Sequence, residues 1–392
     1  MTGKKNIVFV STNWAAPWGG SEVLWSEAAE ELVRKGHAAA ASVYRWPKPA
    51  EQLSRLRKSG IVVHERGFPM ASVRPVLLQK ALRFLGHQAS LRAFPAWLRG
   101  QKPDLICVSL GSPSEDTYLM DCCADCGVPY VIVVQANAEH IWPDDARARV
   151  LIRLFQNARR TFFVSRANLT LLETQLGIEL HNGEVVRNPF NVRYDAVVPW
   201  PADNHLIKLA CVARLDPRAK GQDMLLRVLA SEPWRKREIA VSFFGKGEME
   251  EGLKRLAERW GIGERARFCG HIDNIESVWA DHHALILPSR FEGLPLAEVE
   301  AMLCGRPVIV TDVAGNAELV TEGVTGFIAE APTERHLHQA LERAWQKRSL
   351  WESMGKNAAS SIRKFIPENP SAEFARRLLN LIEGAEPKCL TS

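Results

Sequence analysis

Short apolar runs alternate with helical stretches along the whole chain, and the series occurs twice. Runs that are continuously apolar, rather than apolar at every second residue, are typical of parallel strands buried on both faces. Strand–helix–strand alternation predicts a doubly wound parallel sheet, so we expect an α/β fold. The first series consists of 6–11, 38–44, 104–110, 130–135 and 161–165, and the second of 207–214, 238–245, 266–270, 284–289, 307–312 and 326–330.

The stretch VVPWPADNH, residues 197–205, has no clear helix or strand pattern and separates the two series. A chain of 392 residues is also too long for one ordinary core. We therefore predict two Rossmann-like domains that face each other across a cleft. The first spans 1–198 and the second 199–370, and a further helix follows in 371–392.

Composition narrows the classes of function. The apolar share of 46% and the charged share of 24% are those of a soluble globular protein. A net charge of +5 and a pI near 8.8 suit anionic small molecules or an anionic membrane surface and do not require nucleic acid. No run of 18 apolar residues exists, and the first apolar run is too short for a signal peptide. We expect a cytoplasmic protein, with peripheral contact at the inner face of the plasma membrane as an option.

A cluster of cysteines, DCCADCG, contains one CxxC pair formed by Cys123 and Cys126. Zinc would need further ligands at a suitable spacing, and no second CxxC is present. Packing on a helix is the favoured interpretation, and we expect no metal.

Ligands of doubly wound sheets bind where the carboxyl ends of the strands lead into loops. Gly19 and Gly20 follow the first strand and precede a helix that should begin near Ser21. Glycine permits close approach of the backbone, and the positive end of the helix dipole favours an anion such as phosphate. No GxGxxG is present, and two glycines before a helix are equally common in simple turns.

A second loop brings two cations to a helix N-terminus. Arg214 ends a strand, Lys220 follows a loop, and Gly221 opens the next helix. Arginine can bind a diphosphate bidentately and lysine can bind it as a point charge. The alternative is an exposed basic loop balanced by Asp216 and Asp223.

The segment SRFEGLPLAEVEAMLCGRPVIV, residues 289–310, places acids around an apolar helix that should begin at Pro295 and end near Gly305. Projection at 100° per residue predicts that Glu298 lies opposite the core face and is solvated. The residues of the predicted core face are Leu296, Val299 and Leu303.

Glu300 falls about 40° from Leu296, at the margin of the buried face. A carboxylate there requires hydrogen-bond donors, and the vicinal diol of a ribose would supply two. The alternative partner is an arginine. Glu292 is expected to look into the cleft, and the backbone amides of Gly293 and Leu294 offer a second anion site. Together these features predict a nucleotide diphosphate bound between the domains.

The segment EGLPLAEVE (292–300) resembles the E-x7-E motif of a family of retaining glycosyltransferases with the GT-B fold. This family is glycosyltransferase family 4, also called glycosyl transferases group 1. The resemblance covers most of the chain, with specific motifs in the second half and mainly architecture in the first. Further similar segments, in order, are GGSE, VVRNPFN, ARLDPRAKGQDMLL, FFGKGE, FCGHIDN and GRPVIVTDVAGNAELVTEGVTGFIAE.

The resemblance implies a role for each matched position. Arg214 and Lys220 would hold the donor diphosphate, Glu292 would contact hydroxyls of the donor sugar, and Glu300 would bind the nucleotide ribose. The remaining positions would approach the diphosphate (Gly19, Gly20, Gly293 and Leu294) or lie beside the base (His271 and Ile272).

The implied activity is transfer of a sugar from a nucleoside diphosphate sugar, most often a UDP-sugar, to a hydroxyl acceptor. It implies retention of the anomeric configuration, no divalent metal and no further cofactor, and a final helix that crosses back to the first domain. Two rivals stay open at this level: a GT-B sugar-nucleotide epimerase, and a non-catalytic subunit that only binds nucleotide sugars.

The acceptor side departs from the family pattern. Many relatives carry a His after the strand that 130–135 matches, whereas this chain has Gln135, Ala136 and Asn137, with His140 offset. Either Asn137 or His140 would then serve the acceptor hydroxyl, although a lone His in a loop is commonly a surface residue. The acids of the following WPDD offer further candidates, or the N-cap of the next helix.

Residues 71–102 contain six Arg or Lys and no acid, together with Leu, Phe and Trp at partly helical spacing. A basic amphipathic segment of this kind can lie on anionic lipid. The alternative is an ordinary helix pair that covers one face of the sheet and exposes a basic edge.

Overall fold

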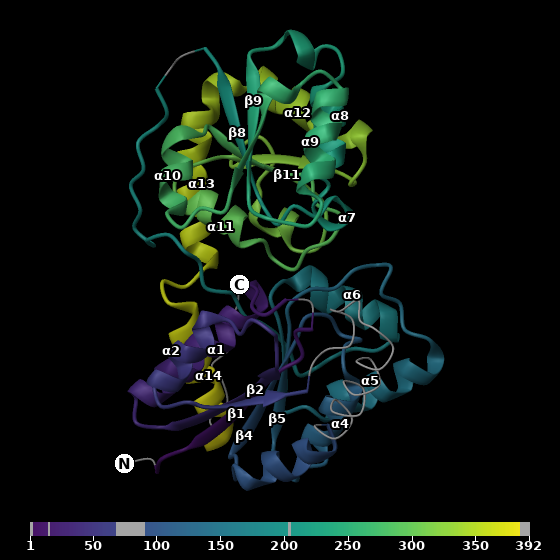
Figure 1. The fold of residues 1–392 in the computed structure, drawn as a ribbon, viewed down its shortest axis with the longest axis vertical. Coiled ribbons are helices and arrows are strands. Elements are labelled where there is room, and N and C mark those ends of the chain that lie inside the picture. The colour runs from purple at the N-terminus through teal and green to yellow at the C-terminus, as the bar shows by residue number, and fades with distance from the viewer. Residues whose placement is uncertain (1–2, 15, 68–90, 203–204, 385–392) are drawn as a thin grey trace. The chain divides into compact units, whose positions relative to one another are not determined.

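The computed structural model describes residues 3–14, 16–67, 91–202 and 205–384. The chain forms two compact units, each built on a parallel sheet, which confirms the predicted α/β class (Figure 1). Unit 1 comprises Met1–Pro189 and Asn369–Ser392, and unit 2 comprises Phe190–Glu368. The last helix therefore belongs to the same unit as the first strand.

Unit 1 holds a seven-stranded parallel sheet in the order β3-β2-β1-β4-β5-β6-β7. Its strands are β1 (Asn6–Ser11), β2 (Ala38–Tyr44), β3 (Val62–Arg66), β4 (Leu105–Leu110), β5 (Tyr130–Val134), β6 (Arg160–Phe163) and β7 (Gly183–Val185). Its helices are α1 (Gly20–Arg34), α2 (Glu51–Lys58), α4 (Thr117–Ala124), α5 (Asp145–Asn157), α6 (Arg166–Leu176) and α14 (Pro370–Glu383), and residues 91–100 are also helical.

Both faces of this sheet are covered, as its continuously apolar strands require. Side chains of α1, α2 and α14 pack on one face, where Phe374 of α14 meets Phe162 edge-on at 5.3 Å between ring centroids. Side chains of α4, α5 and α6 pack on the other face. Figure 1 shows the yellow helix α14 beside the purple helix α1.

Unit 2 holds a six-stranded parallel sheet in the order β10-β9-β8-β11-β12-β13. Its strands are β8 (Ile207–Val212), β9 (Ile239–Phe244), β10 (Ala266–Gly270), β11 (Ala284–Leu287), β12 (Val308–Thr311) and β13 (Gly326–Ala329). Its α-helices are α7 (Pro217–Lys220), α8 (Gln222–Leu229), α9 (Glu250–Arg259), α10 (Ile275–Asp281), α11 (Leu296–Leu303), α12 (Glu334–Gln346) and α13 (Trp351–Phe365). Short 3-10 turns are η2 (Trp234–Lys236), η3 (Gly263–Arg265), η4 (Asn316–Leu319) and η5 (Arg348–Leu350).

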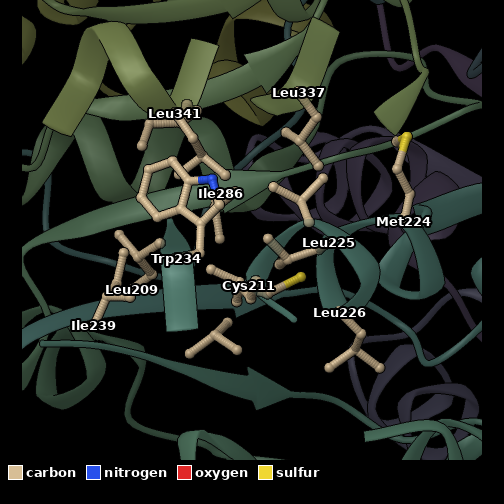
Figure 2. Packing of buried hydrophobic residues seen from close by; sticks show 14 of the residues in the cluster. Leu209, Cys211, Met224, Leu225, Leu226, Trp234, Ile239, Ile286, Leu337 and Leu341 are labelled. Atoms are coloured by element: carbon tan, nitrogen blue, oxygen red, sulfur yellow. The ribbon is translucent and has the colours of Figure 1, made fainter. Parts of the chain in front are cut away.

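The core of unit 2 lies between the sheet and helices α8, α9 and α12. Trp234 is fully buried there (Figure 2), and its indole Nε1 donates to Nδ1 of His338 at 2.9 Å. Burying one large aromatic side chain contributes about 2–3 kcal/mol, so Trp234 is a substantial contributor to the stability of unit 2.

Local signals set the helix ends. Ser165, Thr333 and Asn369 each accept a backbone N–H from the first turn of α6, α12 and α14, which satisfies donors that have no partner inside a helix. Gly177 and Gly384 end α6 and α14 in the left-handed conformation that glycine adopts without strain.

Two strands were not predicted from the sequence, and both lie at an edge of the first sheet. Strand β3 reads VVHER and its first residue, Val62, is exposed, while β7 is only three residues long. An edge strand pairs on one side only and need not be buried on both faces, so it lacks the continuous apolar run that reveals the central strands.

Of the basic segment 71–102, residues 71–90 lie outside the described residues. In the described part, Phe94 and Leu98 are fully buried in the core, while Arg92 and Arg99 are exposed. That part therefore matches the ordinary helix that covers a sheet face. Within the described ranges, no helix is long and apolar enough to cross a membrane.

The cysteine cluster packs on α4, as expected. Cys123 is fully buried and burial raises the pKa of its thiol well above the usual value. Across the described chain, no group of three or more His, Cys, Asp or Glu is arranged to hold a metal ion.

Candidate active site

The loops after β8 and β11 meet at the carboxyl edge of the unit 2 sheet. The backbone N–H groups of Arg290 and Phe291 both donate to the carbonyl of Ala219, at 2.7 and 3.0 Å. Gly221 has a φ of +63°, and a Cβ placed there would lie 1.9 Å from the carbonyl oxygen of Pro288. Only glycine permits this contact, which brings the end of α7 against the loop after β11.

This contact places Lys220 beside Glu292. The ammonium Nζ lies 2.6 Å from Oε1 of the carboxylate, and both side chains are largely buried, with 19% and 7% exposed. Ser289 Oγ donates to the same Oε1 at 2.8 Å, and Thr311 Oγ1 of β12 donates to the Ser289 carbonyl at 2.6 Å. The structure thus brings together the cation predicted for the diphosphate and the acid predicted for the donor sugar.

Arg214 reaches the same edge from the end of β8. Its carbonyl accepts from Gln222 Nε2 at 2.8 Å, while its guanidinium is 56% exposed and lies 3.5 Å from Asp216. Burial would raise the pKa of Asp216, but the hydrogen bond from Arg218 and the charges of Arg218 and Arg214 hold it below its usual value. Asp223, the other balancing acid, pairs with Arg290 instead. Of the two cations predicted for the diphosphate, Arg214 is therefore more accessible than Lys220.

The turn at Gly293 and Leu294 is fixed by the loop after β12, because the Gly293 carbonyl accepts from the Gly315 N–H at 2.9 Å. Among the described residues, the backbone N–H groups of Gly293 and Leu294 have no acceptor. Two such amides just before a helix can receive a phosphate oxygen. They lie one and two residues after Glu292.

Glu300 lies in the second turn of α11 and only 3% of it is exposed. Its partner is not an arginine. Asn191 donates to Oε1 twice, from its backbone N at 2.9 Å and from Nδ2 at 2.8 Å. Burial raises the pKa of Glu300 to about 7, and the two hydrogen bonds from Asn191 oppose that rise.

The prediction that Glu298 is solvated is wrong. The side chain is fully buried, and neither carboxylate oxygen has a partner among the described residues. Burial, together with the negative charges of Glu292 and Glu318, raises its pKa well above the usual value. Of the predicted core face of α11, Val299 and Leu303 are buried and Leu296 is half-buried; helical projection cannot show that α13 and the sheet enclose the rest of this helix.

In unit 1, Gly19 is the N-cap residue of α1 and Gly20 its exposed first residue. A Cβ on Gly19 would come no closer than 3.7 Å to the side chain of Ser21, so packing inside unit 1 does not demand glycine there. Sequence reasoning missed Glu22, which is 3% exposed and accepts from Trp25 Nε1 at 3.2 Å. Burial raises its pKa to about 7. The sequence did contain a signal for Glu22, namely an acid in the first turn of α1 directly after Gly19, Gly20 and Ser21.

The two acceptor-side candidates have different environments. Asn137 is 1% exposed, donates to Gln175 Oε1 at 2.9 Å and accepts the Ala138 N–H at 2.9 Å, so its side chain holds the loop after β5. His140, three residues on, is exposed. Asp144 caps α5 by accepting the Arg147 N–H at 2.8 Å, which was the alternative interpretation of the WPDD acids.

The segment expected beside the base follows β10. His271 is exposed, with Nε2 3.3 Å from Asp273 Oδ1, and Ile272 is half-buried. Both lie at the carboxyl end of a strand of unit 2, as do the residues around Lys220 and Glu292.

Comparison with known proteins identifies the family of the chain. Residues 198–361 match the family model of glycosyl transferases group 1, and residues 18–194 match that of glycosyltransferase family 4. The chain belongs to the family 4 glycosyltransferases, and its fold is GT-B. The assignment rests on both halves of the chain, since each model accounts for one of them.

A GDP-mannose-dependent alpha-(1-6)-phosphatidylinositol monomannoside mannosyltransferase of Mycolicibacterium smegmatis is 25% identical over 83% of this chain and 85% of its own length. The Vi polysaccharide biosynthesis protein VipC/TviE of Salmonella typhi is 38% identical over 28% of this chain, and that match spans only 19% of the Salmonella protein. The crystal structure of Anabaena Alr3699/HepE in complex with UDP has a TM-score of 0.74 at 18% identity, covering 96% of this chain and 99% of that one. This last likeness shows the shared fold.

Proposed function

We propose that this glycosyltransferase moves a sugar from a nucleoside diphosphate sugar to a hydroxyl acceptor, with the donor bound at the carboxyl edge of the unit 2 sheet. The observation that carries the proposal is the Lys220–Glu292 pair at 2.6 Å, directly followed by two backbone amides that have no acceptor within the described part of the chain. A cation, an acid and an amide pair at one turn match the charge pattern of a diphosphate joined to a polyhydroxylated sugar.

Each charged group has one role in the proposed reaction. Lys220 and Arg214 neutralise the negative charge that develops on the departing diphosphate, which lowers the barrier without a divalent metal. Glu292 accepts hydrogen bonds from donor-sugar hydroxyls, and the amides of Gly293 and Leu294 bind a phosphate oxygen. Glu300 accepts from the ribose.

The glycosidic bond to the leaving phosphate breaks on the same face of the sugar on which the acceptor oxygen forms its bond, so the anomeric configuration is retained. A phosphate oxygen of the departing diphosphate takes the acceptor proton. Proton NMR of the product, which distinguishes the anomers, tests this part: an inverted anomer would contradict it.

The nucleotide is proposed to be UDP. The Anabaena protein of the same fold was crystallised with UDP, whereas the mycobacterial relative is described as GDP-mannose-dependent, so GDP is the competing base. In unit 1, we propose that His140 contacts the acceptor and that Asn137 shapes the loop that carries it. The cytoplasmic location and any contact with anionic membrane stay predictions.

A thermal-shift screen with UDP-, GDP- and ADP-sugars tests the donor proposal, because a ligand that binds only the folded protein raises its melting temperature. One donor series should stabilise the protein, and the responding donor should then give product with a hydroxyl acceptor. No stabilisation by any nucleotide sugar would overturn the proposal.

The two rivals give different results in the same assay. An epimerase converts the responding donor without acceptor. A binding-only subunit is stabilised by the donor but shows no turnover for Glu292→Gln to reduce, whereas the proposed transferase loses turnover in that variant.

A further inference from the structure

Asn191, near the start of unit 2, hydrogen-bonds to the carboxylate of Glu300. It lies one residue after Phe190, with which unit 2 begins, and its side chain is at the surface. Its backbone N and its Nδ2 both donate to the same atom, Oε1 of Glu300, at 2.9 and 2.8 Å. Two donors on one oxygen fix the rotation of the carboxylate as well as its position.

The other carboxylate oxygen is left open. Among the described residues, Oε2 of Glu300 accepts no hydrogen bond, yet it is not among the buried atoms without a partner. Both oxygens of Glu298, two residues earlier on α11, are sealed in the interior without partners. The small exposed part of Glu300 therefore includes Oε2, with two lone pairs available to donors from outside the protein.

We propose that Asn191 is a positioning residue for the donor nucleotide: by occupying Oε1 it turns Oε2 toward the ribose and makes the site select ribose over 2′-deoxyribose. The proposal rests on the function proposed above, in which Glu300 binds the ribose. A hydroxyl donates well to a carboxylate but poorly to a neutral acid, so Asn191 must also keep Glu300 ionised.

The surroundings of Glu300 leave that second task to Asn191. Helix α11 packs against α13, β11 and β12, and neither of those two strands carries a titratable side chain. The thiol of Cys304, which follows α11, interacts electrostatically with Glu300 and also with Glu276 on α10, Arg363 on α13 and Arg306, and burial raises the pKa of this thiol to about 12. The pKa of Glu300 itself responds to burial, which raises it to about 7, and to the hydrogen bonds from Asn191, which lower it.

The test measures dissociation constants of UDP and 2′-deoxy-UDP between pH 6 and 9, or of the guanosine pair if GDP is the nucleotide that binds. Because both nucleotides share the same base and phosphates, the ratio of their dissociation constants isolates the 2′-hydroxyl. The variants are Asn191→Ala, which removes one donor, and Asn191→Asp, which keeps the shape and turns a donor into an acceptor. Arg193→Ala is the matched control, since it removes the side-chain contacts between the same segment and Glu276 and leaves both donors to Glu300 in place.

In the wild-type protein the ribose preference should be about tenfold above pH 7 and should fall as Glu300 is protonated below that pH. In Asn191→Ala the midpoint of that fall should move up by about one pH unit, since one hydrogen bond to a charged group is worth about that much, and Asn191→Asp should move it further. Arg193→Ala should keep the wild-type ratio at every pH.

If Asn191 has a purely structural role, its variants should weaken the binding of both nucleotides equally. The ratio of the two dissociation constants and the pH midpoint of that ratio would then be unchanged, which would overturn the inference while the donor proposal stands. If the wild-type protein binds both nucleotides equally, the 2′-hydroxyl makes no favourable contact with Glu300, and the inference is overturned. A protein that binds neither UDP nor GDP would overturn the proposed function and the inference together.

Discussion

The carboxyl edges of the two sheets are both polar, but they use their charges differently. In unit 2, Arg214 is half-exposed and Glu300 keeps one oxygen open, so the edge can exchange internal contacts for contacts with a ligand. In unit 1, polar groups at the ends of β1, β2 and β3 bind one another. Arg66 is fully buried at the end of β3, where it donates to Ser42 Oγ at 2.8 Å and to the Ser11 carbonyl.

The unit 1 network continues through aromatic and acidic groups. The guanidinium of Arg66 lies 4.6 Å from the ring centroid of Tyr44, whose hydroxyl donates to Asp116. Burial and the charge of Asp116 raise the pKa of Tyr44, so the phenol stays neutral. This edge ties the ends of β1, β2 and β3 together. The comparison teaches that charge at a sheet edge indicates a ligand site only where the charge keeps an accessible atom.

The largest effect should come from the open edge. Lys220→Gln removes the cation that we propose stabilises the departing diphosphate and should lower kcat/KM by about 10²–10³-fold. Lys208→Gln is the matched control. Lys208 lies at the start of β8, the strand that precedes the segment of Lys220, and pairs with Asp281 at 2.5 Å. Steady-state transfer assays should show near wild-type activity for the control. Equal losses in both variants would show that the effect of Lys220 is not specific to the carboxyl edge of the unit 2 sheet.

The closed edge should respond in stability. Arg66→Met leaves Ser42 and the charge of Asp116 without a buried cation and should cost about 3 kcal/mol of the free energy of unfolding. Urea unfolding followed by circular dichroism measures this. A loss below 1 kcal/mol would mean that the network contributes little to holding the strand ends.

Asn137→Ala separates the two readings of the acceptor loop. The variant removes the buried partner of Gln175 and should cost about 1–3 kcal/mol of unfolding free energy. At a temperature where it is fully folded, it should keep most of its transfer activity, whereas His140→Ala should lose more activity than stability. If Asn137→Ala is stable and inactive, the assignment of the two residues must be exchanged.

The smallest effect concerns the buried acid of α11 and depends on pH. In the folded protein the pKa of Glu298 lies well above its ordinary value of 4.5, so the unfolded chain ionises first as pH rises and wild-type stability falls over that interval. Gln at this position cannot titrate. The unfolding free energy of Glu298→Gln relative to wild type should therefore increase by about 1 kcal/mol or more between pH 4.5 and 8. Parallel pH profiles would contradict the burial of an unpaired acid.

Most of the fold could be predicted from the sequence, because strands buried on both faces must be continuously apolar. All eleven predicted strand runs overlap strands of the structure, and β10 (Ala266–Gly270) has the predicted bounds. The edge strands β3 and β7 were missed because one open side relaxes that requirement. The candidate site residues of unit 2 could be proposed from the sequence because they follow strand ends at short spacing, and the structure brings Lys220 and Glu292 together.

The sequence could not reveal contacts that depend on how elements pack. Glu298 was expected in solvent because projection treats α11 as a helix with one covered side. The partners of Glu300 and Asn137 come from segments far away along the chain, Asn191 and Gln175, and no local spacing indicates them. The buried network of Arg66 was not predicted either, because its partners Ser11 and Ser42 are also distant in the sequence.

The most direct test of the account is a calorimetric titration of UDP, or of the nucleotide that responds in the screen, into wild type, Glu300→Ala and Glu298→Gln. Both acids lie on α11 and both are buried, but among the described residues the carboxylate oxygens of Glu298 are sealed without partners, whereas Oε2 of Glu300 is not. We predict that Glu300→Ala weakens binding by about 10- to 100-fold with folding intact, while Glu298→Gln binds like wild type. Equal affinity of Glu300→Ala and wild type would contradict a donor nucleotide at this edge.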